Sequence, residues 1–310
     1  MRHGRICNGV NLSRNRAPAA IFMAPMNTYQ RLVSEYARLL QTGKSDPLGG
    51  FAPSSRPDVP SDAPKVLIFS PHPDDECIIG GLPLRLLRQA RMRVINVAVT
   101  QGSKKERQAE RFKELQGACE YMGYGLIQTC PNGLEKISVK TRTQEPGVWA
   151  KSVQVVDGIL EKNRPKVIFF PHEQDWNSTH IGTHFLVLDA LQSLGRDFGC
   201  FVVETEFWGA MPAPNLMVES SQEDVADMVA GTSFHVGEVR RNPFHLFLPA
   251  WMQDNVRRGS ELVGGQGEAA PDFTFATLYR LRRWKEGRLE NVFDGGKILP
   301  SALNPAGLLA

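Results

Sequence analysis

KVLIFSPHPDDE, at residues 65–76, is the stretch of the chain that decides its fold. The apolar run from Val66 to Phe69 has the length and the β-branched content of a buried strand. Polar side chains follow where that strand would end. Ligands of α/β proteins bind in the crevice beyond the carboxyl ends of their strands. The stretch therefore predicts an α/β sheet with a polar site at the end of its first strand.

The acidic residues of this stretch have two interpretations. Asp74, Asp75 and Glu76 could simply begin a helix, because the helix dipole favours negative charge in the first turn. That interpretation leaves His72 unexplained. In the second interpretation the stretch is half of a metal site: His72 and Asp75 are ligands that suit Zn²⁺, and one carboxylate remains for proton transfer. The combination of a strand with Pro-His-Pro-Asp-Asp-Glu favours the metal site.

The composition excludes several classes of protein. The chain has 310 residues, 42% of them hydrophobic and 22% charged, as in ordinary globular proteins. The net charge of +3 gives little support for nucleic-acid binding, and no apolar run approaches the roughly 20 residues of a membrane helix. The 5 cysteines include no Cys-x-x-Cys pair, which fits reduced thiols. We therefore expect a cytoplasmic protein that binds neither nucleic acid nor membrane, with homo-oligomerisation left open.

Strands and helices are expected to alternate after the first strand. Such alternation indicates a Rossmann-like, doubly wound and mostly parallel sheet. The expected strands lie at residues 65–70, 93–99, 125–129, 165–171 and 201–208, and the expected helices at about 77–91, 104–122, 148–163 and 179–191.

The chain is expected to divide into four parts. Residues 1–26 are basic and lack acidic residues, which predicts a disordered extension or a true start at Met26. Residues 27–64 are predicted to form an amphipathic helix and a Pro- and Gly-rich arm. Residues 65–208 would form the α/β core that carries the site, and residues 209–310 an irregular C-terminal extension packed on that core.

A second polar stretch, HEQDWNSTHIGTH, follows the predicted strand at residues 165–171. A helix is expected to begin at Ser178 or Thr179, either of which can cap a helix N-terminus. His180 would then lie in the first turn, facing the crevice, with His184 one turn deeper on the same face. If the strands are parallel, both polar stretches lie at one edge of the sheet.

These residues suggest a catalytic zinc site, which usually has three protein ligands and one open position. His72, Asp75 and one histidine of the second stretch would make such a set, and ligands of these types also accept Fe²⁺, Co²⁺ or Mn²⁺. His184 is the weaker ligand candidate, because a supporting hydrogen bond suits its depth better. Asp175 is a candidate to support a ligand or to bind substrate. Arg240 could recognise an anionic group such as a phosphate.

The strand followed by Pro-His-Pro-Asp-Asp-Glu resembles the metal-binding signature of the LmbE-like, PIG-L family of zinc-dependent N-acetylglucosamine-type deacetylases. The similarity spans residues 66–208 and includes Thr100-x-Gly102, Arg111-x-x-Glu114 and Asn177-x-x-His180. It implies a metal-dependent hydrolase that removes the acetyl group from an N-acetylated amino sugar or a related small conjugate.

The resemblance also implies roles for individual residues. It makes His72, Asp75 and His180 the metal ligands and Asp74 the general base for the attacking water. It places Arg111 near the sugar hydroxyls, whereas the charge pattern of the helix around Arg111 predicts a solvated face.

Asn177 departs from the family pattern. Family members often carry a histidine three residues before the third ligand, where it helps to stabilise the oxyanion, and this chain has Asn177 there. An amide can donate a hydrogen bond but cannot carry positive charge or transfer a proton. Either the metal and Asn177 suffice, or His184, His235 or His245 takes the part.

Three other functions stay open on the sequence alone. The same site could hydrolyse another small-molecule amide. The protein could instead be a non-catalytic carbohydrate-binding member of the family, with Asn177 as a sign of lost activity. A closed four-ligand site completed by His184 would indicate a metal-linked scaffold.

Overall fold

The computed structural model describes residues 27–53 and 56–310. The chain divides into two compact units, residues 1–43 and 44–310. In the first unit, the amphipathic helix predicted after residue 27 is present as α1 (Tyr29–Gly43). The extension predicted at residues 1–26 lies outside the described residues.

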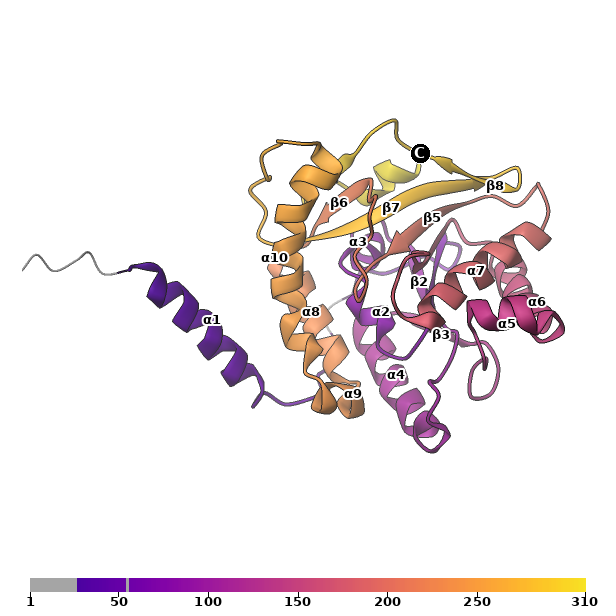
Figure 1. Ribbon diagram of the computed structural model, residues 1–310, viewed down its shortest axis with the longest axis horizontal. Helices are drawn as coiled ribbons and strands as arrows, with labels where there is room; N and C mark the ends of the chain where they lie inside the picture. Colours follow the sequence, from indigo (N-terminus) through magenta and orange to yellow (C-terminus); the bar gives the residue numbers. More distant parts are fainter. Residues whose placement is uncertain (1–26, 54–55) are drawn as a thin grey trace, which may run out of the picture. The chain divides into compact units, whose positions relative to one another are not determined.

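The second unit is built on a mixed sheet, which has nine strands within the described residues (Figure 1). The strand order is β3-β2-β1-β4-β5-β7-β6-β9, and β8 pairs with β7. Five consecutive strands are parallel and confirm the predicted sheet: β1 (Lys65–Ser70), β2 (Arg93–Ala98), β3 (Gly125–Gln128), β4 (Val167–Pro171) and β5 (Cys200–Thr205). The other strands are β6 (Leu216–Glu219), β7 (Ala276–Lys285), β8 (Arg288–Asn291) and β9 (Lys297–Leu299).

Helices cover both faces of this sheet (Figure 1). On one face lie α2 (Asp75–Ile78), α3 (Leu82–Arg88), η1 (Lys105–Arg107), α4 (Gln108–Met122), α8 (Gln222–Ser233), α9 (Val236–Arg241), η2 (Phe244–Phe247) and α10 (Leu248–Gly259), which continues into the π-helical turn η3 (Ser260–Gly264). On the other lie α5 (Val139–Gln144), α6 (Pro146–Asn163) and α7 (Ser178–Ser193). The short helix η4 (Pro305–Leu309) follows β9.

β1 shows why both faces must be covered. Val66 and Ile68 pack into one hydrophobic cluster, and Leu67 and Phe69 pack into another on the opposite face. Successive side chains of a strand point to opposite faces, so an unbroken apolar run needs a helical layer on each side.

The strand order changes direction between β1 and β4. The chain runs outward from β1 to β2 and β3, then returns to the other side of β1 with β4 and β5. A switch point of this kind leaves a crevice at the carboxyl ends of two adjacent strands. The two polar stretches follow β1 and β4, so the topology brings them together.

The single helix predicted at residues 77–91 is wrong. It is split into α2 and α3 by a turn at Gly80, which has φ 91°. A Cβ at Gly80 would lie 2.3 Å from Thr277 Oγ1 of β7, so glycine is required by both conformation and space. The Tyr279 hydroxyl donates to the Ile79 carbonyl at 2.8 Å and secures the turn. The glycine therefore lets the turn pack closely against β7.

The C-terminal third, residues 209–310, is more regular than the irregular extension expected from the sequence. β7 pairs antiparallel with β5 and β6, and β9 extends the sheet from β6. Runs as short as β6 and β9 give almost no periodic signal, which is why they escape sequence analysis. This third is therefore part of the same sheet as the core.

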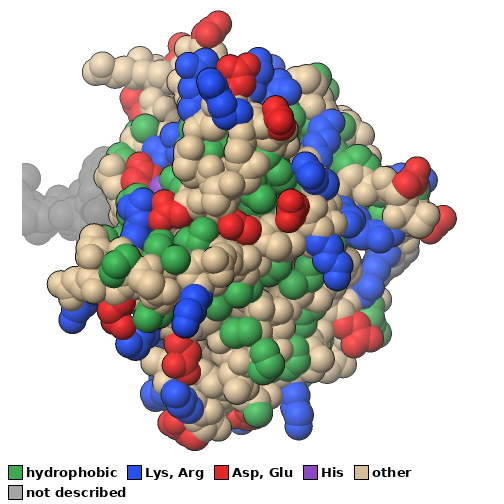
Figure 2. Space-filling view, turned by 90° about the vertical axis from the view of Figure 1, so that its right-hand side faces the viewer, with side chains coloured by type: hydrophobic (Ala, Val, Ile, Leu, Met, Phe, Trp, Pro, Cys, Tyr) green, Lys and Arg blue, Asp and Glu red, His purple; other side chains and the backbone are tan. Residues whose placement is uncertain are grey.

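The distribution of charge on the surface and the polarity of the helices match what the composition predicts. Lys and Arg side chains are interspersed with Asp and Glu over the face that Figure 2 shows, as a net charge of +3 leads one to expect. Among residues 27–53 and 56–310, the helices are all too short or too polar to cross a membrane.

Arg85 joins α3 to the C-terminal segment and is only 1% exposed. Its guanidinium donates to the carbonyl oxygens of Glu219 at 2.9 Å, Pro300 at 2.9 Å and Leu303 at 2.6 Å. A guanidinium has five N–H donors in a fixed plane, so one side chain can satisfy several buried carbonyls.

Replacing Arg85 should therefore destabilise the protein. In Arg85→Leu these carbonyls lose a charged donor, and we expect the free energy of unfolding to fall by about 3 kcal/mol or more. Chemical denaturation measures this. The exposed Arg196→Leu is the control, with an expected change within about 0.5 kcal/mol; equal effects of both substitutions would contradict the anchoring role.

Candidate metal centre

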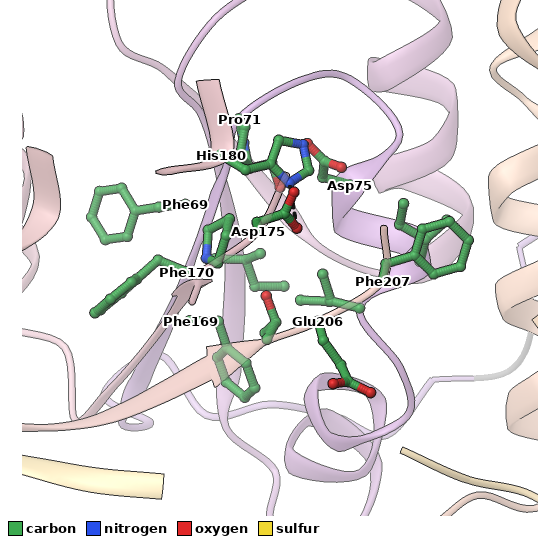
Figure 3. A pocket seen from close by; sticks show the side chains of 15 residues that line it. Phe69, Pro71, Asp75, Phe169, Phe170, Asp175, His180, Glu206 and Phe207 are labelled. Atoms are coloured by element: carbon green, nitrogen blue, oxygen red, sulfur yellow. Dashed lines mark ion pairs between the residues drawn. The ribbon is translucent and has the colours of Figure 1, made fainter. Parts of the chain in front are cut away.

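The candidate site lies where β1 and β4 end, at the switch point of the sheet (Figure 3). His72 and Asp75 come from the loop after β1 and the start of α2, and His180 comes from the first turn of α7. The residue that caps α7 is Asn177, whose Oδ1 accepts from the Thr179 N–H at 2.9 Å, so the predicted cap at Ser178 or Thr179 is wrong.

Three ligand atoms converge at this point. His72 Nδ1 lies 3.2 Å from His180 Nε2, and Asp75 Oδ2 lies 3.5 Å from His72 Nδ1 and 3.4 Å from His180 Nε2. Tetrahedral ligands at about 2.0–2.1 Å from an ion are about 3.3–3.4 Å from one another. We call these three residues the triad. Their spacing and donor types fit a divalent metal ion without any rearrangement of the side chains.

Asp175 contacts the ring nitrogen of His180 that faces away from the other two triad residues. Its Oδ2 lies 3.5 Å from His180 Nδ1, and its Oδ1 accepts from the Asn177 N–H at 2.8 Å. Figure 3 shows His180 between Asp75 and Asp175. A carboxylate on the rear nitrogen of a histidine fixes the ring orientation and tautomer of a metal ligand. Asp175 is 4% exposed, which suits a supporting role.

The charges of the triad and of Asp175 shift the pKa values of His180 and Asp75 in opposite directions. Burial alone lowers the pKa of His180, but Asp75 and Asp175 raise it to about 10. Burial would raise the pKa of Asp75, yet His180 and His72 bring it far below its usual range. The pair is thus stable as an imidazolium beside a carboxylate, and a bound cation can take the place of the imidazolium proton.

Asp74 stands beside the triad with an unusual backbone. Its φ of 118° lies in the left-handed region, where a non-glycine residue is strained. Burial and the neighbouring Asp75 raise the pKa of Asp74 well above its usual range. Strain of this kind is typical of functional positions, where the surrounding structure holds it in place.

Arg111 of α4 lies against this loop. Its Nη2 donates to the Pro73 carbonyl at 3.0 Å and lies 4.0 Å from Asp74 Oδ2. Its side chain is 12% exposed, so the solvated face predicted for this helix is wrong at Arg111. A contact of Arg111 with sugar hydroxyls stays a prediction.

Two predicted site residues lie away from the triad. His184 Nδ1 lies 3.0 Å from the Pro171 carbonyl, and its ring packs on Phe170 and Phe185. Arg240 is exposed in the last turn of α9. Among the described residues, the triad forms a cluster without a fourth His, Cys, Asp or Glu, so an ion bound by these three side chains would keep a coordination position for water or substrate.

A second cluster of potential metal ligands comprises Glu173, His184 and Glu204, and arginines neutralise its carboxylates. Arg280 Nε lies 2.6 Å from Glu204 Oε2 and its Nη2 pairs with Glu173, while Arg282 Nη2 lies 2.7 Å from Glu204. Two guanidinium groups therefore balance the two carboxylates without a metal.

A third cluster comprises Glu76, Cys77 and His235, all buried. Burial raises the pKa of the Cys77 thiol well above its usual range, and the thiol donates to Glu76 Oε1 at 3.3 Å. Glu76 Oε1 lies 2.7 Å from His235 Nε2, which pairs the carboxylate with the imidazole. This cluster is therefore a hydrogen-bonded one. Nothing in the sequence links His235 to Glu76, which lies 159 residues earlier.

A polar pocket of about 410 Å³ opens beside His72. Its lining includes hydroxyl and amide side chains, namely Thr100, Ser103, Gln108, Ser138 and Thr179. Such side chains can hydrogen-bond a polyhydroxylated ligand next to the triad.

These features define an α/β protein with an open His-Asp-His site at the switch point of its sheet. Residues 67–191 match the family described as PIG-L: GlcNAc-PI de-N-acetylase. The chain thus contains a PIG-L family domain, which includes the whole triad. No curated protein matches the chain.

Several solved structures share the fold. N,N'-diacetylchitobiose deacetylase from Pyrococcus horikoshii is 16% identical with a TM-score of 0.51, over 86% of this chain and 96% of that one. The A40926 pseudoaglycone deacetylase Dbv21 is 14% identical with a TM-score of 0.53, over 73% and 99%. GalB, the 4-carboxy-2-hydroxymuconate hydratase from Pseudomonas putida, is 13% identical with a TM-score of 0.50, over 70% and 95%. At these identities the likeness shows the fold alone.

The triad leads to a prediction about metal content. Wild-type protein should bind about one divalent ion per chain, and His180→Ala should bind little, because two ligands hold an ion weakly. Asp175→Asn should keep the ion with roughly 10–100-fold lower affinity. Elemental analysis and chelator competition measure both. The control is His245→Gln, which replaces a buried histidine outside the triad. Equal metal content in wild type and His180→Ala would overturn the site.

Proposed function

We propose that this protein is a metal-dependent N-deacetylase that releases acetate from an N-acetylated amino sugar or a related small conjugate. The observation that carries the proposal is the open triad of His72, Asp75 and His180 beside the strained Asp74. The PIG-L family domain over residues 67–191 supports the same reaction class.

The triad would hold the metal and Asp175 would orient His180. A divalent ion there supplies Lewis-acid polarisation of an acyl oxygen and lowers the pKa of water towards ~7. Zinc is the expected ion from the ligand types, and Fe²⁺, Co²⁺ and Mn²⁺ suit the same donors.

Asp74 supplies the proton transfers. Its carboxylate takes a proton from the attacking water as the oxygen–carbon bond forms, then delivers that proton to the amine nitrogen as the carbon–nitrogen bond breaks. The products are acetate and the free amine. The hydrogen bond from Arg111 to the Pro73 carbonyl helps to hold Asp74 in place for both transfers.

Asn177 is the proposed donor to the oxyanion. Its side-chain oxygen caps α7 by accepting from the Thr179 N–H, which leaves the amide nitrogen as the atom that can donate to a ligand. The pocket beside His72 would accommodate the sugar hydroxyls. The role of Arg240 in binding an anionic group stays a prediction.

The first test of the proposal compares acetate release by wild type and Asp74→Asn. The substrates are N-acetylglucosamine-type sugars, their conjugates and larger amides. We expect release by wild type, loss on chelation, and a roughly 10²–10⁴-fold lower kcat in the variant, because an amide cannot act as general base. Metal content of the variant should stay near that of wild type.

The outcomes of this test separate the alternatives. Sugar binding without acetate release would favour the carbohydrate-binding protein, which the presence of Asn177 in place of a histidine also favours. Turnover of larger amides alone would favour the general amidase. A fully active Asp74→Asn enzyme would remove Asp74 from the mechanism.

Substitution of Asn177 tests the oxyanion role separately from capping. In Asn177→Ser the side-chain oxygen can still cap α7, so thermal stability should change little. The amide donor is lost, and kcat should fall by roughly 10²–10³-fold with metal retained. Unchanged kcat would mean that another group stabilises the oxyanion. Asn177→Ala, which also loses the cap, shows the size of the stability effect.

A further inference from the structure

We infer that His235 is a positioning residue: by binding Glu76, it holds the strained backbone at Asp74 in the conformation that the reaction requires. The inference rests on the proposed function of Asp74. It concerns a residue outside the family domain at residues 67–191, in the C-terminal third of the chain.

Glu76 links His235 to the strained residue. One oxygen, Oε1, lies 2.7 Å from His235 Nε2, and the other, Oε2, accepts from the Asp74 N–H at 3.1 Å. Glu76 is 1% exposed and His235 0%. A buried carboxylate needs partners for both oxygens, so the imidazole fixes the carboxylate that in turn fixes the backbone of Asp74.

Asp74 depends on such external restraints. A non-glycine residue at φ 118° persists only where neighbouring contacts over-determine the backbone. Within the turn, the Cys77 N–H donates to the Asp74 carbonyl at 3.1 Å, and from α4 Arg111 donates to the Pro73 carbonyl at 3.0 Å. The Glu76–His235 pair is the restraint on the Asp74 N–H itself.

The corner between α8 and α9 holds His235 firmly. The His235 N–H donates to the Thr232 carbonyl at 3.1 Å, and the His235 carbonyl accepts from the Glu238 N–H at 2.9 Å. Glu238 also pairs with Arg107 at 2.9 Å and lies 3.8 Å from Arg111 Nε. The same corner therefore contacts the Asp74 loop by two routes, through Glu76 and through Arg111.

Two variants of His235 in the full-length protein test this inference. Gln at position 235 can still donate to Glu76 with its amide nitrogen, whereas Leu cannot. Amide exchange of residues 74–78 should quicken at least tenfold in His235→Leu and stay near wild type in His235→Gln. The Leu variant should also lose roughly 10²-fold in kcat with little change in KM, as expected for a misplaced catalytic group, and the Gln variant should recover most of it.

A control variant, a replacement variant and a metal measurement make the outcome specific. Asp189→Asn removes the charge and one of the two oxygens that accept from Arg142 and Trp149 on the opposite face of the sheet, and it should lower Tm without altering kcat or exchange at residues 74–78. If His235→Leu does not fold, His235→Asn replaces it, because that amide is polar but too short to reach Glu76. Metal content should stay at about one ion per chain in all of them.

The inference fails if His235→Leu or His235→Asn keeps wild-type kcat and exchange. It also fails if wild type holds two ions and each His235 variant loses one, since the cluster with Glu76 and Cys77 would then be a metal site. Absence of acetate release by wild type would instead sink the proposed function, and amide exchange would still report whether His235 restrains Asp74.

Discussion

The rest of the site depends on one electrostatic constraint, the burial of Asp75 between His72 and His180. Asp75 is 3% exposed, and a carboxylate so buried must have positive charge beside it. The ligand atoms of the triad, which come from loops after two different strands, lie 3.2–3.5 Å apart. Such close approach is possible because positive charge, on a protonated imidazole or on an ion bound in its place, balances the carboxylate. The strand order supplies the place, since β1 and β4 are the neighbouring strands between which the sheet changes direction.

The sequence predicts those parts of this arrangement that are local. The strand before His72, the helix after Asn177 and the meeting of the two polar stretches all follow from motifs and from the rule for parallel sheets. The strand against which Gly80 packs could not be predicted, because Thr277 follows almost 200 residues later. The same holds for His235, since the contact with Glu76 is set by packing of the C-terminal third, where periodic signals are weak.

The fold does not determine the reaction by itself. The solved structures that share it include two deacetylases and a hydratase, so the chemistry must come from side chains placed on a common frame. In this chain the distinguishing side chains are the strained Asp74, its supports and Asn177, which combines a capping oxygen with a free amide nitrogen. A functional assignment of a related chain should therefore compare these positions before it compares overall similarity.

The packing of β7 against Gly80 also bears on the order in which the parts of the site are synthesised. All residues of the triad have been synthesised once His180 emerges, but β7 (Ala276–Lys285) completes the sheet beside β5 and holds the turn behind the first motif only much later. During that interval the nascent chain presents the ligands without the strand that orders their support. Synthesis of the triad and completion of the sheet that supports it are therefore separated in time, and premature termination between α7 and β7 would yield a chain that carries the whole triad but lacks the strand that packs behind it.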